Sequence, residues 1–225
     1  MSILARTSTI RDSIFGIAQQ KFYDEGYFAC SVKSIATELA IPSSLILYHF
    51  RQKKFLVEEV YIQFEANNRE AIAEVAGEIE NPMLSFFVTR MLLYREALLD
   101  SNIERLRYEM LSSENLGFAR IDMYKVFLKQ LSAYYHLNTD HLDPDVLAGM
   151  LFNATKSVFI DLHEGTLPYK DENALFSTVE AAAPRYMGIS EIEIQRWLSQ
   201  ARELTDKILK NNHDSPREIF FRNLN

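Results

Sequence analysis

Two short helical patterns separated by a proline-containing turn fall within residues 31–56. Ser31 is a suitable N-cap for the first helix. Apolar residues then recur at the three- and four-residue spacing of one helix face: Val32, Ile35, Ala36 and Leu39. Pro42 lacks a backbone N–H and disfavours helical geometry in the residue before it, so a turn is expected at residues 40–42. The spacing therefore predicts two helices joined by a tight turn, a helix-turn-helix.

The second of these helices divides into an apolar side and a polar side. Its apolar residues anchor one face of the helix and include Leu45, Ile46, Leu47 and Phe50. The residues expected to point outward are Ser43, Ser44, Tyr48 and His49. In a helix-turn-helix, the second helix lies in the DNA major groove and contacts the bases with outward polar side chains. The pattern therefore indicates a DNA-binding element.

A longer helix is predicted to precede this pair, over residues 9–25. Apolar residues form one stripe along it: Ile10, Ile14, Phe15, Ala18 and Phe22. Thr9 with Asp12 forms a candidate capping box at its start, and Gly26 is placed to end it. The three helices together predict a small DNA-binding head.

These residues resemble the N-terminal domain of the tetracycline-repressor (TetR) family of bacterial transcription regulators. The positions that carry the resemblance over residues 9–60 are Phe22, Gly26, Ser31, Ile35, Ala36, His49, Phe50, Arg51, Lys53 and Leu56. Three positions depart from the family pattern. The turn glycine is Ala40, the small residue early in the recognition helix is Ser44, and the usual tyrosine is Leu47, with Tyr48 one place later. Leucine cannot donate to a phosphate, so that contact is either lost or passed to Tyr48.

The resemblance implies an all-α protein with two domains. Residues 1–57 would form a three-helix DNA-binding domain with the helix-turn-helix, and residues 58–225 a larger helical bundle for ligand binding and dimerisation. It implies a regulator, most often a repressor, that leaves a near-palindromic operator when a small molecule binds. The retained alternative is a ligand-free architectural or partner-binding helix-turn-helix protein, which would show a filled bundle core.

The charge of the chain differs between its two parts. Residues 1–57 hold seven Lys/Arg against four Asp/Glu, a net charge of +3, so the other 168 residues carry −10 of the overall −7. An acidic protein binds DNA when its cations lie on one face, because each neutralised phosphate releases counterions locally. The other interpretation is an ordinary solvated surface with a slight basic excess. The basic residues are Arg6, Arg11, Lys21, Lys33, Arg51, Lys53 and Lys54.

Specific DNA contacts follow from these patterns. We predict contacts to base edges or sugars from Ser43, Ser44 and Tyr48. Contacts to phosphates are predicted from Lys33, His49, Lys53 and Lys54, although the His49 ring would alternatively pack inward and shape the turn. Ser31 is predicted both to cap its helix and to donate to a phosphate, and Leu45 completes the predicted set.

The C-terminal part is predicted to consist of further helices. The low content of glycine and proline, 7 and 6 residues, and the scarcity of strand-like runs favour an all-α protein. Loop signals delimit a long helix over residues 53–77 and later helices over 83–99, 102–112, 117–136, 144–164, 172–187 and 190–211. Their apolar faces predict one bundle. The final residues, from Asn211, form either a loose tail or, because of Ile219, Phe220 and Phe221, a docked one.

Two surfaces of this bundle have predicted roles. The predicted helix 144–164 is apolar around much of its circumference. The resemblance implies that it forms a homodimer interface together with the following helix. The alternative is a core helix of a monomer. A pocket for a small amphipathic or apolar ligand is predicted among Met91, Tyr94, Arg95, Tyr108, Phe118, Tyr124, Phe127, Phe152, Phe159 and His163. The groups that could orient a polar or anionic end of the ligand are Arg95, Arg107, Lys156 and His163.

Other classes of function find little support in the sequence. The single cysteine, Cys30, excludes an internal disulfide, and the chain shows no signal peptide and no membrane-spanning run, so a cytoplasmic protein is expected. No phosphate-binding loop, serine-nucleophile motif or zinc motif occurs, and the five-residue spacing of His136 and His141 does not suit a metal site. We therefore predict no enzyme, no cofactor and no metal.

Overall fold

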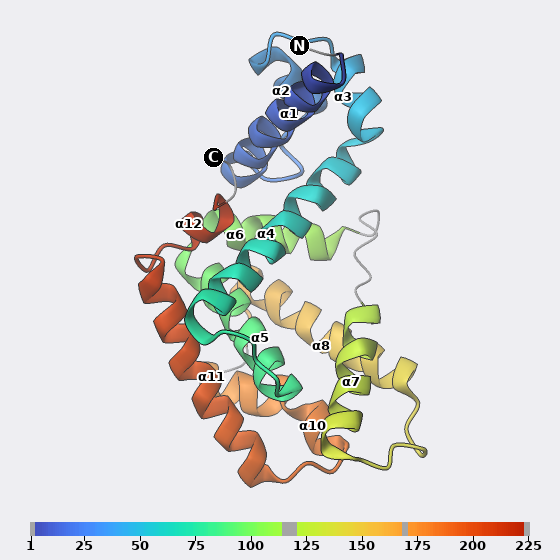
Figure 1. Cartoon of the computed structure of the whole chain (residues 1–225), viewed down its shortest axis with the longest axis vertical. Coiled ribbons are helices and arrows are strands. Elements are labelled where there is room, and N and C mark those ends of the chain that lie inside the picture. The colour runs from blue at the N-terminus through green and yellow to red at the C-terminus, as the bar shows by residue number, and fades with distance from the viewer. Residues whose placement is uncertain (1–2, 114–120, 168–170, 223–225) are drawn as a thin grey trace.

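Figure 1 shows the computed structural model, which describes residues 3–113, 121–167 and 171–222, with side chains described from residue 10 onward. The described residues contain helices and no strands, so the all-α prediction is confirmed. The helices are α1 (Ile3–Glu25), α2 (Val32–Glu38), α3 (Ser43–Phe50), α4 (Lys53–Ala76), α5 (Pro82–Leu99), α6 (Ser101–Ser112), α7 (Ile121–Tyr135), α8 (Pro144–Glu164), α9 (Glu172–Leu175), the π-helix η1 (Phe176–Glu180), α10 (Ala182–Tyr186), α11 (Glu191–Asn211) and α12 (Pro216–Phe220).

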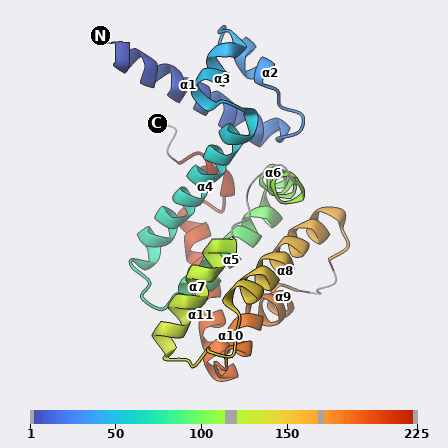
Figure 2. The same ribbon diagram turned by 90° about the vertical axis from the view of Figure 1, so that its right-hand side faces the viewer.

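The molecule has a head at one end and a helical body at the other. Helices α1, α2 and α3 form the head, and α4 runs from the head into the body (Figures 1 and 2). The body contains α5, α7, α8, α10 and α11, while α6 crosses beneath the head. Helix α4 continues through residues 57 and 58, where the sequence predicts a domain boundary.

The helix boundaries follow local capping chemistry. The Ser31 hydroxyl accepts from the Ser34 amide, and the Ser34 hydroxyl accepts from the Ser31 amide, which closes a capping box at the start of α2. Asn81 accepts from two amides at the start of α5, and Asp143 does the same for α8. Gly165, with φ +68°, ends α8 in the left-handed conformation that glycine adopts without strain.

Two predicted helices differ from the observed ones. Helix α1 begins at Ile3, so the predicted start at Thr9 with a Thr9–Asp12 capping box is wrong. The predicted helix 172–187 is divided into α9, η1 and α10, because η1 has π-helical hydrogen bonding and Ala181 ends it. The first residues of the predicted helix 117–136 lie outside the described residues, and α7 is described from Ile121.

The C-terminal segment is docked on α1 and α4. Helix α12 places Ile219 and Phe220 at 0% exposure, with the Phe220 ring 4.9 Å from Phe64 and 5.3 Å from Tyr23. The side-chain amide of Asn67 donates to the Ile219 carbonyl (2.9 Å) and that of Gln19 to the Phe220 carbonyl (2.7 Å). The docked interpretation of the tail is therefore correct, and the end of the chain connects the head helix α1 to α4.

Candidate nucleic-acid interface and ligand cavity

The turn between α2 and α3 is held by a Schellman motif. The Ile41 amide donates to the Ala36 carbonyl (3.0 Å) and the Ala40 amide to the Thr37 carbonyl (3.2 Å). Ala40 occupies the left-handed position of this motif, with φ +52°. An L-residue there costs roughly 1–2 kcal/mol because its Cβ crowds the backbone. The departure noted at this position in the sequence is therefore a strained alanine in an otherwise ordinary turn.

Helix α3 presents a polar and partly apolar outer face. Tyr48 is 76% exposed and Leu47 43% exposed, while Ser44 is also exposed. Ser43, Leu45 and His49 are half-buried, and the His49 ring contacts the rings of Tyr48 and Phe50. Ile46 and Phe50 are buried and fix the helix to the head core. Of the residues predicted to point outward, Ser44 and Tyr48 are exposed, whereas Ser43 and His49 are half-buried. Leu47, predicted on the anchoring face, is exposed instead, because that face is set by Ile46 and Phe50.

Lys53 occupies a structural position instead of the outer face. Its ammonium donates to the carbonyls of Tyr27 (2.7 Å) and Cys30 (2.9 Å) and lies 4.1 Å from the centre of the Tyr27 ring. Burial lowers the pKa of this lysine. The predicted assignment of Lys53 as a phosphate contact therefore needs correction: its ammonium fixes the 26–31 loop that carries Ser31, the N-cap of α2.

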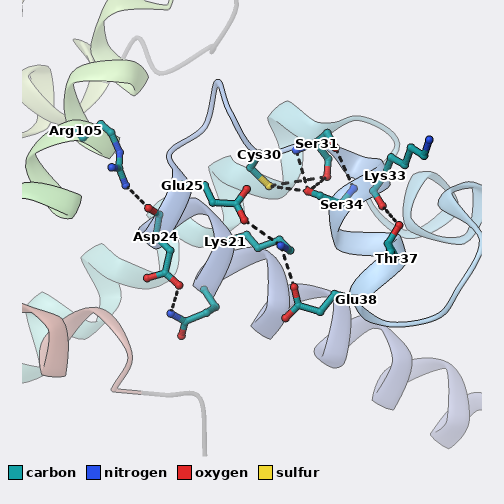
Figure 3. Close-up of polar contacts among 11 residues, drawn as sticks. Lys21, Asp24, Glu25, Cys30, Ser31, Lys33, Ser34, Thr37, Glu38 and Arg105 are labelled. Carbon is teal, nitrogen blue, oxygen red and sulfur yellow. Dashed lines mark hydrogen bonds and ion pairs between the residues drawn. The ribbon is translucent and has the colours of Figure 1, made fainter.

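Two other basic residues of the head are neutralised by carboxylates. Arg11 pairs with Glu59 at 2.6 Å. Lys21 lies between Glu25 (3.0 Å) and Glu38 (2.9 Å), as Figure 3 shows. Lys33 and Arg51 are exposed, and the half-buried Lys54 lies 5.0 Å from the Phe55 ring. The described side chains that can supply unpaired positive charge to DNA are therefore fewer than the sequence count suggests: Lys33, Arg51 and Lys54.

A polar joint connects the head to α6. Arg105 donates to the carbonyls of Tyr23 (2.8 Å) and Asp24 (2.9 Å) at the end of α1. The Glu109 carboxylate accepts from the backbone amides of Tyr27 and Phe28. Gly26 lies between these contacts with φ +85°, and a Cβ built on it would lie 2.7 Å from Glu109 Oε1. Glycine is required here by both its backbone conformation and the close approach of α6. The sequence placed Gly26 at the end of the first helix, and the close approach of Glu109 is a second reason for glycine at this position.

The body encloses a cavity of about 580 Å³. Helices α4, α5, α6, α7 and α8 all contribute to its wall. Its aromatic wall includes Phe86 and Phe127, whose rings stack with their centres 3.9 Å apart. A volume of this size lies within the range typical of small-molecule sites.

Six of the residues predicted for the pocket line this cavity, and five do not. Tyr124, Phe127, Phe152 and Phe159 belong to its wall, together with Arg107 and Lys156. Phe118 lies outside the described residues. The others lie elsewhere: Met91 is fully buried in the core, Tyr94 packs on Phe159 and Phe176, Arg95 pairs with Glu172 and Asp206, and Tyr108 stacks at 3.7 Å on His163, which pairs with Glu104.

Sequence reasoning missed several residues of the wall. Tyr61 and Asn68 reach the cavity from α4, and Phe86, Thr89 and Arg90 from α5. Arg90 pairs with the buried Glu180 at 3.2 Å, and Thr155 donates to the same carboxylate at 3.4 Å. The only signal in the sequence was Arg90 itself, a charge inside the most apolar stretch of the chain.

A buried polar cluster adjoins the cavity where α4, α5 and α6 meet. Glu96 is 0% exposed and lies 3.9 Å from the Arg107 guanidinium, and Asn68 donates to Glu96 at 3.2 Å. Burial raises the pKa of Glu96 to about 8, although Arg107 acts in the opposite direction. The carboxyl group is therefore mostly protonated at neutral pH.

The head with its helix-turn-helix and the cavity-bearing helical body define the class of fold: an N-terminal helix-turn-helix domain followed by a larger helical bundle. Solved structures share this fold. TylP, a TetR regulator from Streptomyces fradiae, has 19% identity and a TM-score of 0.52 over 92% of this chain and 100% of its own. CprB, a TetR-family protein from Streptomyces coelicolor A3(2), has 13% identity and a TM-score of 0.52, and the match covers 90% of this chain and 99% of CprB. A gamma-butyrolactone receptor described as ArpA-like has 15% identity and a TM-score of 0.50, and the match covers 90% of this chain and 99% of the receptor.

These likenesses establish that the chain has the fold of TetR-family regulators. Neither a protein-family model nor a curated protein sequence matches it. CprB has also been solved in complex with its biological operator sequence. Within the described residues, no helix is long and apolar enough to cross a membrane, and no three His, Cys, Asp or Glu side chains gather as metal ligands would.

Proposed function

We propose that this protein is a homodimeric transcription regulator of the TetR type, working on DNA in the cytoplasm as a repressor that a small molecule releases from a near-palindromic operator. Residues 1–57 would form the DNA-binding domain and residues 58–225 the ligand-binding and dimerisation domain. The observation that carries this proposal is the outer face of α3, where Ser44 and Tyr48 are exposed on a helix held by a Schellman turn. The operator complex of CprB supports the same use of the fold.

The proposed DNA contacts combine base reading with phosphate binding. Ser43, Ser44, Leu45 and Tyr48 would approach bases and sugars, while Ser31, His49 and the cations Lys33, Arg51 and Lys54 would approach phosphates. Leu47 is exposed where a hydrogen-bond donor would serve better, and the adjacent Tyr48 hydroxyl is the available replacement. Lys53 would contribute indirectly, by holding the loop that presents Ser31.

Exposed apolar residues on α8 support the proposed dimer. Val146 is 60% exposed and Met150 is 64% exposed, one helical turn apart. Tyr186 on α10 is 68% exposed. Apolar side chains that remain exposed in a single chain are typical of subunit interfaces. Two heads paired in this way would read half-sites about one DNA turn, roughly 34 Å, apart.

Helix α6 supports a connection between the cavity and the head. Successive residues of a helix are about 100° apart, so Arg105 and Glu109 share one face and Arg107 points to the opposite side. The first pair holds the end of α1 and the following loop, and Arg107 lines the cavity. A ligand that prefers a different position of α6 would thereby change the population of DNA-competent heads.

Selection of bound sequences from random duplex DNA by the purified protein tests this proposal. Enrichment of a near-palindrome, bound by a species with the mass of a dimer, is expected. Lys33→Ala and Lys54→Ala should each lower the slope of log affinity against log salt by about 0.9. Ser44→Ala should change the preferred sequence. Lys207→Ala, at an exposed lysine of α11 outside the head, is the matched control and should leave binding unchanged.

Failure to enrich any sequence, with no binding even at low salt, would contradict the proposal. In that case the partner-binding alternative would be favoured for the head. The open cavity argues against a purely architectural role, because a bundle with no ligand has no need to leave about 580 Å³ unfilled.

A further inference from the structure

The charged residues of the cavity wall are mainly cationic. Arg69, Arg90, Arg107 and Lys156 contribute positive charge, against Glu65 and Asp122. The Arg90 charge is already matched by Glu180 at 3.2 Å. Asp122 has a side chain that is 90% exposed and lies 3.6 Å from Lys125, so its charge is screened by solvent at the rim. The remaining charged residues of the wall are the exposed Arg69, the half-buried Glu65 and Lys156, and the buried Arg107.

Arg107 is a buried cation with incomplete hydrogen bonding. The residue is 2% exposed, and its Nη1 donates to the Leu93 carbonyl. Its Nε and Nη2 atoms are buried and have no hydrogen-bond acceptor. The guanidinium carbon lies 4.9 Å from the centre of the Phe159 ring and 5.8 Å from that of Phe64, so aromatic rings cover it without accepting those protons.

Among the described residues, Glu96 is the carboxyl group that lies near Arg107, and no hydrogen bond joins the two. Glu96 Oε2 is 3.9 Å from Nη2, beyond hydrogen-bond distance, and burial raises the pKa of Glu96 to about 8. Arginine stays protonated under all these conditions. A buried charge without a partner is strongly unfavourable, and the protein gains stability if an anion pairs with it.

The unpaired side of Arg107 has a definite chemical preference. Nε and Nη2 lie on one edge of a planar guanidinium, and two parallel N–H donors there match the two oxygens of a carboxylate. Lys156 adds a second cation: it is half-buried in the wall and has no ion-pair or hydrogen-bond partner among the described residues. The rest of the wall is largely apolar, with Phe86, Phe127 and Phe152 around the same space.

We propose that the cavity binds a carboxylic acid with an apolar body, whose carboxylate pairs with Arg107 while its hydrocarbon or aromatic part packs on Phe86, Phe127, Phe152 and Phe159. This inference rests on the proposed function, since it assigns a ligand class to the sensory cavity. Binding would supply acceptors for the two open Arg107 donors and remove an unpaired charge beside the α6 joint. Lys156 would add long-range attraction for the same anion.

Calorimetric titration of the full-length protein without DNA tests the ligand class. The probes are decanoate and 4-phenylbutanoate, each compared with its uncharged primary amide of nearly the same shape. Each carboxylate is expected to bind at least about ten-fold more tightly than its amide. Arg107→Gln should abolish that preference, and Arg107→Lys should retain part of it. Arg196→Gln, which removes an exposed arginine of α11 that does not line the cavity, is the matched control and should change affinity less than about two-fold.

Three results would overturn the inference. The first is equal or tighter binding of the amides, which would assign the cavity to neutral ligands. The second is absence of carboxylate binding to the wild-type protein at millimolar concentration. The third is an unchanged carboxylate preference in a folded Arg107→Gln protein. The comparison of acid with amide on the wild-type protein needs no variant, so it remains decisive if Arg107→Gln does not fold.

The DNA selection experiment separates this inference from the proposed function. Dimeric operator binding without carboxylate binding would leave the regulator proposal standing and refute the ligand class. Carboxylate binding without any DNA binding would support the ligand class and refute the regulator proposal.

Discussion

Replacement of Ala40 by glycine is expected to stabilise the protein, although glycine usually weakens a helical segment. Ala40 has φ +52° at the left-handed position of the Schellman motif that ends α2. An alanine in this conformation costs roughly 1–2 kcal/mol more than a glycine. Glycine costs about 0.4–1 kcal/mol more than alanine through the greater freedom of its unfolded chain. Ala40 is exposed, so no packing is lost. The net gain is about 0.5–1 kcal/mol.

Thermal unfolding followed by far-ultraviolet circular dichroism, at one fixed protein concentration, measures this effect. For a protein of this length 1 kcal/mol corresponds to a rise in Tm of about 2–4 °C, so the expected rise is about 1–4 °C. Urea midpoints at an unchanged slope give the free energy independently. Constant concentration matters because the Tm of the proposed dimer would depend on it.

A matched substitution supplies the control for Ala40→Gly. Ala73 is an exposed alanine within α4, where helical geometry gives glycine no advantage, and Ala73→Gly should cost roughly 0.8–1 kcal/mol. Opposite signs for the two substitutions are the expected result. If Ala40→Gly lowered the free energy of unfolding as Ala73→Gly does, the argument from left-handed strain at the turn would be refuted.

Three further substitutions test the buried cluster, the docked tail and the joint. Burial raises the pKa of Glu96 to about 8 in the folded protein, against 4.5 for the free group, so the unfolded chain loses this proton first and the free energy of unfolding falls as pH rises between those values. In urea titrations across that range, the free energy of unfolding of Glu96→Gln should rise relative to that of the wild type by about 1.4 kcal/mol per pH unit. A difference that stays constant with pH would count against the assignment. The charged groups that affect Glu96 are Arg107 and Asp100. Phe220→Ala should cost about 3–5 kcal/mol by urea unfolding, and a loss below 1 kcal/mol would mean that α12 does not dock in solution. Gly26→Ala should cost roughly 2 kcal/mol or more by the same measurement, and a neutral result would contradict the close approach of Glu109.

The helical framework was predictable because its signals are local. Proline and glycine positions, N-cap side chains and apolar periodicity lie within a few residues of the boundary that they determine, as Ser31 and Gly165 show. The helix start at Thr9 failed for a local reason as well: a capping pattern also occurs inside a helix, and nothing in the preceding residues indicated that the helix had already begun.

The site residues were harder to predict because burial depends on distant partners. Lys53 had the right position in the motif for a phosphate contact, but its partners are carbonyls 26 and 23 residues earlier. Arg95 and His163 were expected in the pocket and instead pair with Glu172 and Glu104, 77 and 59 residues away. Sequence periodicity gives the face of a helix on which a charge lies, but it does not give the helix that covers that face.

Helix α6 illustrates this limit and its functional consequence. Its range was predicted closely, as residues 102–112 against the observed Ser101–Ser112. Arg107 was predicted as a group that could orient a ligand, but no sequence signal indicated that Arg107 would be 2% exposed and Glu109 8% exposed. Neither charge is tolerated in the interior for stability alone, since a well-packed apolar side chain would cost less. Glu109 is matched by backbone amides of the head, whereas two donors of Arg107 have no hydrogen-bond acceptor. On the proposed assignment, an anion that binds these donors would recover their cost, so the same unpaired charge would set both ligand affinity and the position of α6 under the head.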